Sequence, residues 1–218
     1  MSLWENSENQ ASLQMIDVAV AAALAITVFY EWWPTLGTRF YQDDHWHLFL
    51  AQNPSLGIIP GIIPWAQDWR PLGTFAPFYL MRGAFGLNPF AFHLTNMLVH
   101  LISGFLVYRL ALVMLGAREF ALLAASFYTL HLAHTRSMQW AAGIDNFLSA
   151  VWYLLAFSLY LRSRKHGGSW AYWGSLAAFA AALLTKEWSI TLVVVILWYE
   201  FTCGPAPSQL TQRAQWKT

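Results

Sequence analysis

The chain has 218 residues, of which 57% are hydrophobic, 17% aromatic and only 11% charged. A soluble globular domain carries about 25% charged residues, so this chain lacks the charge to cover a surface that faces water. Its net charge of +1, without a basic block, argues against nucleic acid as a partner. Thirteen tryptophans fit a protein whose indole rings settle where water meets lipid. The composition therefore predicts an all-α, polytopic helical membrane protein surrounded by membrane lipids.

The N-terminal segment does not have the pattern of a cleaved signal peptide. It contains Glu5, Glu8 and Asp17 but no Lys or Arg before the first apolar run. We therefore expect that run, residues 16–33, to remain as a spanning helix. A span needs about 20 apolar residues to cross a hydrocarbon core about 30 Å thick.

A long outer loop, residues 34–88, is expected next, with short helices at 45–52 and 72–84. Asn88-Pro89 then provides a helix cap followed by proline at the first helical position, and Gly116 is a typical helix end. The chain is predicted to form one transmembrane domain over residues 1–203, followed by a polar cytoplasmic tail at 204–218. Its six expected spans are 16–33, 89–115, 119–132, 146–161, 170–184 and 189–201.

Basic residues favour the cytoplasmic side of a membrane protein, and their distribution predicts the orientation. With cytoplasmic termini, seven basic residues lie inside: Arg109, Arg118, Arg162, Arg164, Lys165, Arg213 and Lys217. Five lie outside: Arg39, Arg70, Arg82, Arg136 and Lys186. Six acidic residues also lie outside: Glu31, Asp43, Asp44, Asp68, Asp145 and Glu187. We therefore expect a multi-pass protein of the cell membrane whose first loop is extracytoplasmic.

The adjacent carboxylates Asp43 and Asp44 are the strongest candidate for chemistry. Charged groups near lipid are costly, and two like charges side by side repel unless something compensates them. A carboxylate here could deprotonate an acceptor hydroxyl or hold a divalent metal ion. Arg70, Arg136 and Lys186 could bind an anionic phosphate. The alternative for each of these charges is that it simply marks a helix end in the headgroup zone.

For the histidines and a second charged pair, a purely structural role is also an alternative to a functional one. His93, Asn96 and His100 share one face of a predicted span, where interhelical hydrogen bonding is the main interpretation and metal or haem ligation the lesser one. His134 belongs to the outer polar set. Lys186-Glu187 is either a self-neutralising pair at a helix turn or part of a phosphate site.

In order along the chain, several motifs resemble the membrane half of a GT-C glycosyltransferase. They are Asp43-Asp44-His45-Trp46, Arg70-Pro71-Leu72, Gly86-Leu87-Asn88-Pro89, His93, Asn96 and His100, His134-Thr135 with Gly143, and Lys186-Glu187. The pattern is most similar to the transmembrane O-mannosyltransferases that carry tetratricopeptide repeats and to their bacterial relatives. It covers about residues 36–201.

The resemblance implies an enzyme that takes a sugar from a polyprenyl-phosphate carrier on the outer face. It implies that Asp43 is the catalytic base, with Asp44 supporting it or binding a metal. Arg70 and Lys186 are then the implied contacts for the carrier phosphate, with Arg136 nearby and His93, His134 and Glu187 in support.

The chain departs from the family pattern in two places. After His134-Thr135 the family usually has Glu, where this chain has Arg136. Further on, the family pattern Gly-Arg-x-Asp is replaced by Gly143-Ile144-Asp145-Asn146. Family members also continue through further spans, so the C-terminal half is expected to be absent here.

Two functions remain open from the sequence. One is a shortened glycosyltransferase that moves a sugar from a polyprenyl phosphate to a hydroxyl acceptor. The other is a non-catalytic accessory or scaffold subunit that packs its apolar faces against other membrane protein subunits of a larger complex.

Overall fold

The computed structural model describes residues 3–53, 70–166 and 168–203. All regular structure in these ranges is helical, without a strand, which confirms the predicted all-α class. The predicted tail at 204–218 and the candidate Asp68 lie outside the described residues.

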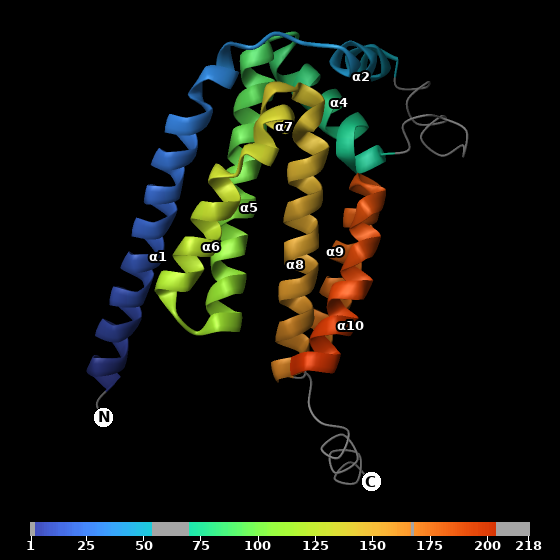
Figure 1. Cartoon of the computed structure of the whole chain (residues 1–218). Helices are drawn as coiled ribbons and strands as arrows, with labels where there is room; N and C mark the ends of the chain where they lie inside the picture. Colours follow the sequence, from blue (N-terminus) through green and yellow to red (C-terminus); the bar gives the residue numbers. More distant parts are fainter. Residues whose placement is uncertain (1–2, 54–69, 167, 204–218) are drawn as a thin grey trace.

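Six helices stand side by side as a bundle (Figure 1). They are α1 (Leu3–Trp32), α5 (Pro89–Leu115), α6 (Arg118–Leu130), α8 (Ile144–His166), α9 (Ser169–Thr185) and α10 (Leu192–Cys203). The start of α1 and the end of α10 lie at the same end of the bundle (Figure 1). The orientation of that end relative to the cytoplasm stays a prediction.

Shorter elements gather at the opposite end of the bundle (Figure 1). Two segments of the long loop are helical, namely α2 (Asp43–Gln52) and a π-helical turn η2 (Pro71–Phe75) that continues into α4 (Ala76–Phe85). The remaining short elements are η1 (Trp33–Gly37), η3 (Leu132–His134), α7 (Thr135–Gln139), η4 (Ala141–Gly143) and η5 (Glu187–Thr191). Apart from His93 on α5, the predicted site residues therefore collect on or beside these short helices and turns.

Three segments of the described chain are long and apolar enough to cross a membrane. They are Met15–Gly37, Pro89–Leu115 and Ala141–Lys165. The helices α6, α9 and α10 have 13, 17 and 12 residues, which is short of the usual spanning length of about 20. The membrane class is therefore supported, while the count of six spans stays a prediction.

Local sequence explains the bounds of α5. The Asn88 side chain accepts a hydrogen bond from the Phe90 amide at 3.2 Å, and Pro89 occupies the first helical position. Gly116 ends the helix with a φ of 70°, a left-handed conformation that glycine adopts without steric cost.

The polar face of α5 is directed into the protein. His93, Asn96 and His100 are all buried. His93 Nε2 lies 2.8 Å from the Thr38 hydroxyl, Asn96 Nδ2 donates to a loop carbonyl at 2.7 Å, and His100 Nε2 lies 3.0 Å from the Thr129 carbonyl. Each of the three side chains thus has a polar contact to another helix or a loop, as the hydrogen-bonding interpretation of the stripe expects, while the buried Asn96 Oδ1 and His100 Nδ1 have no partner in the described chain.

Candidate functional site

Asp44 is a buried anchor that holds two segments of the chain together. Its side chain is fully buried at the start of α2. One carboxylate oxygen accepts hydrogen bonds from the amides of Tyr41 (2.9 Å) and Ala141 (3.3 Å), and the other accepts from the Ala142 amide at 2.7 Å. Both oxygens thus accept hydrogen bonds from backbone amides, one in the turn before α2 and two in η4. This arrangement makes Asp44 a positioning residue rather than a reactive one.

The turn before α2 has a strained backbone, and it forms part of the hydrogen bonding to Asp44. Gln42 has a φ of 44°, which is rare for a residue other than glycine. Such conformations cost about 1–3 kcal/mol and persist where surrounding contacts determine them. Here the turn places the Tyr41 amide against the Asp44 carboxylate.

Asp43 is exposed and lines a cavity of about 280 Å³. The other lining residues are His47, Arg70, Thr74, Arg136, Ser137, Trp140, Ala142, Gly143, Asp145, Asn146 and Lys186. They come from α2, η2, α7, η4, α8 and the end of α9. The fold therefore brings Asp43 and all three predicted phosphate-binding cations to one cavity, while Asp44 points away from it.

A network of ion pairs crosses one wall of the cavity. Arg70 Nη1 contacts Asp145 at 2.7 Å, and its Nε and Nη2 form a fork to Glu187 at 3.1 and 2.8 Å. Lys186 Nζ contacts Asp145 at 3.0 Å and the Asn146 side-chain oxygen at 2.5 Å. The hydrogen bond from Arg70 holds the pKa of Glu187 below its ordinary value of 4.5. Both cations therefore already face carboxylates within the protein.

Arg136 is placed differently from the other two cations. Its guanidinium lies over the Trp140 ring, 4.2 Å from the centroid. It is exposed and takes part in no ion pair of the described residues. It is thus the cavity cation with the most capacity left for an incoming anion.

The predicted supporting residues divide between the cavity wall and the core. Glu187 pairs with Arg70, as described, and His93 is buried behind the site. The His134 ring packs against the rings of His100 and Tyr128, with centroids 4.7 and 4.9 Å apart. Burial lowers the pKa of His134, so its neutral form is favoured. Neither His134 nor His93 lines the cavity, and their supporting role stays a prediction.

Several cavity residues were not among the predicted site residues. Thr74 lines the cavity from η2, and nothing in its local sequence indicates this; Asn146 lines it from α8, within the segment that departs from the family pattern. His47 could have been found, because it follows Asp43 by four residues and so shares its helical face.

The predicted metal site does not fit the geometry of the acidic pair. Both Asp44 oxygens are occupied by backbone amides, as shown above. Within residues 3–53, 70–166 and 168–203 there is no cluster of three or more His, Cys, Asp or Glu side chains placed to hold a metal. The chemistry considered below therefore uses no metal ion held by this pair.

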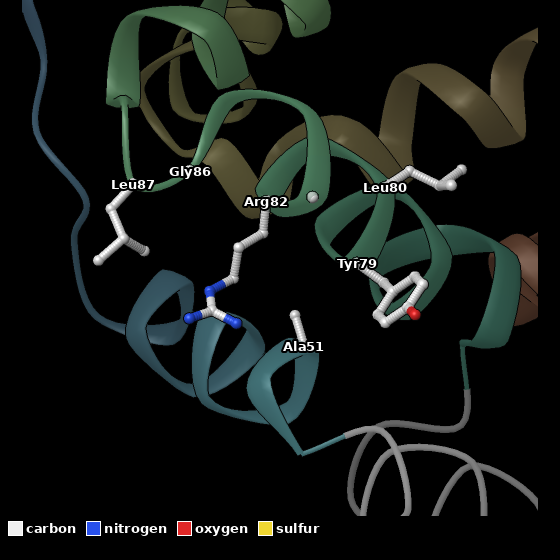
Figure 2. A pocket seen from close by; sticks show the side chains of 7 residues that line it. Ala51, Tyr79, Leu80, Arg82, Gly86 and Leu87 are labelled. Carbon is white, nitrogen blue, oxygen red and sulfur yellow. The ribbon is translucent and has the colours of Figure 1, made fainter.

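A second pocket lies between α2 and α4, with a volume of about 570 Å³. Figure 2 shows Arg82 reaching from α4 toward α2, between Leu87 and Ala51. Tyr79 and Leu80 complete its apolar wall. The lining contains no carboxylate among the described residues, so this pocket offers no base.

Fold and site together define a helical membrane protein with an exposed carboxylate and a group of cations in one cavity at the end of its bundle. The family model described as dolichyl-phosphate-mannose-protein mannosyltransferase matches residues 71–216. The chain belongs to this family of GT-C-type glycosyltransferases, as the resemblance in sequence predicted.

Curated relatives agree with this assignment. The chain is 31% identical to Protein O-mannosyl-transferase Tmtc1 of Drosophila melanogaster over 203 residues, which cover 85% of this chain and 23% of the relative. It is 31% identical to Tmtc2 of the same organism over 174 residues, covering 76% and 17%. It is 29% identical to human TMTC1 over 171 residues, covering 73% and 18%. The chain thus spans less than a quarter of the length of these relatives. No solved structure matches it.

Proposed function

We propose that this chain transfers a sugar from a polyprenyl-phosphate carrier to a hydroxyl acceptor on the extracytoplasmic face of the membrane. The names of its family and relatives favour mannose as the sugar and a protein as the acceptor. The observation that carries the proposal is the cavity that Asp43 lines together with three cations, while Asp44 is buried.

Asp43 is the catalytic base in this proposal. Its carboxylate takes the proton from the acceptor hydroxyl as the hydroxyl oxygen attacks the anomeric carbon of the sugar. The bond between that carbon and the carrier phosphate breaks, and its electron pair leaves with the phosphate. Since the leaving group is already a phosphate, the protein needs only to position the reactants and stabilise the charge.

Arg136 is the first contact proposed for the carrier phosphate, because its guanidinium is not paired with a carboxylate of the described chain. Arg70 and Lys186 stabilise the departing phosphate from the other wall while they remain in contact with Asp145. Glu187 is 63% exposed at its side chain, so its half of the network can exchange with water when the phosphate arrives.

The experiment is a transfer assay on the chain reconstituted in lipid with polyprenyl-phosphate mannose and a hydroxyl-bearing acceptor peptide. Asp43→Asn should abolish transfer and leave the thermal midpoint unchanged, because Asp43 is exposed. Glu119→Gln is a matched neutralisation of an exposed carboxylate on α6, outside the cavity, and should keep full activity. Transfer that persists in the Asp43 variant would remove it as the base.

The ion pairs at Arg70 and Lys186 also favour a second candidate, a non-catalytic subunit of a larger membrane complex. In that function the network is a permanent structural brace rather than a phosphate site. Stoichiometric co-purification with other subunits from native membranes, together with no transfer by the wild-type chain, would support it. An active isolated chain would exclude it.

A further inference from the structure

Residues from the C-terminal halves of α5 and α8 line a further cleft. These halves lie at the end of the bundle opposite α2 (Figure 1). The volume of the cleft is about 310 Å³. Its walls are Leu110 and Val113 from α5 and Leu155, Ser158, Leu159 and Leu161 from α8, and its cationic residues are Arg109, Arg162 and Lys165. The cleft therefore combines an apolar interior with three basic side chains.

The positive charge of this cleft is not cancelled by the described residues. Arg162 and Lys165 are exposed and make no ion pair within the described part of the chain, and Arg162 only lies over the Trp170 ring at 4.9 Å. Arg109 contacts Asp17 at 2.5 Å, but the same carboxylate also lies 3.8 Å from Arg118. One carboxylate thus faces two guanidiniums, and the cleft is left with an excess of positive charge.

The cleft runs along the helix axes. Its α8 wall extends from Leu155 to Lys165, which is about 15 Å along a helix; the apolar part to Leu161 is about 9 Å of this, and the rest carries the cations. Spread over the length of this wall, a volume of about 310 Å³ gives a cleft about 5 Å wide, which is too narrow for a polypeptide helix about 10 Å across with its side chains. A single acyl chain fits between the leucines, and its head then lies among the cations.

We propose that this cleft binds an anionic phospholipid, with one acyl chain between α5 and α8 and the phosphate at Arg162 and Lys165. Basic pockets between membrane helices bind anionic head groups in this way. The site is distinct from the sugar-transfer cavity and does not depend on the proposed function.

Native mass spectrometry on the purified full chain tests this proposal with phosphatidylglycerol and phosphatidylcholine of identical acyl chains. The wild type should retain one phosphatidylglycerol preferentially. Because each basic residue contributes about fivefold to such binding, the double variant Arg162→Gln with Lys165→Gln should lower the affinity about twenty-fivefold. Arg164→Gln is the matched control, since Arg164 pairs with Glu200 and does not line the cleft.

A second variant separates the acyl chain from the charge. Ser158→Leu fills the cleft and leaves every cation in place, so it should also release the lipid while the thermal midpoint stays at the wild-type value. Equal retention of the two lipids, or wild-type affinity in the double variant, would overturn the proposal. A photoreactive side chain at position 158 that cross-links to another polypeptide instead of lipid would also overturn the proposal.

Discussion

Replacing Asp44 with asparagine should destabilise the protein far more than the same change at Asp43. The side-chain amide of the Asp44→Asn variant offers one oxygen and one NH2 group where the carboxylate offers two oxygens to three backbone amides. In its better orientation this amide still accepts from Tyr41 and Ala141, but its NH2 group then faces the Ala142 amide. A buried donor left unsatisfied costs about 1–3 kcal/mol, and the two remaining bonds lose the benefit of a charged acceptor.

The expected total is about 3 kcal/mol, a large part of a typical stability of about 5–15 kcal/mol. For a domain of this size, that corresponds to a fall of about 6–12 °C in the thermal midpoint. The measurement is loss of the monomer peak in size-exclusion chromatography after heating in detergent. Asp43→Asn serves as the control and should keep the wild-type midpoint. If the Asp44 variant melts within about 1 °C of the wild type, the amides do not depend on this carboxylate, and the assignment of Asp44 as a structural anchor is wrong.

Two further predictions concern the turn η2 and the ion network. A Cβ at Gly73 would lie 2.3 Å from the Thr185 carbonyl oxygen, whereas nothing lies within 4 Å of one at Gly83. Gly73→Ala should therefore lower both the thermal midpoint and transfer, and Gly83→Ala should lower neither; equal midpoints would contradict this packing. Because Arg70 depresses the pKa of Glu187 from 4.5, the contribution of Glu187 to stability is fully present above that pH and is lost as the pH falls through the folded-state pKa. Glu187→Gln should thus melt below the wild type at about pH 6, and the difference should shrink as the pH falls below 4.5; a difference that grows with acidity would count against the pairing.

Much of the helical architecture follows from local patterns in the sequence. The length of an apolar run locates a span, and Asn88-Pro89 and Gly116 set the bounds of α5 because caps and left-handed glycine are local effects. The polar stripe on α5 was predictable for the same reason, since a helical period places its members on one face. These features need no knowledge of what packs against them.

For the acidic pair, sequence and tertiary structure supply different information. The sequence indicated that the Asp43-Asp44 pair is unusual, and the family resemblance implied Asp43 as the base with Asp44 in support. The packing of α2 on η4 gives the physical difference between the two, because successive helical residues point about 100° apart and only the Asp44 direction meets buried amides. Likewise, the carboxylates that neutralise Arg70 are 75 and 117 residues away along the chain. Contacts across such separations depend on how the bundle closes, which no local pattern encodes.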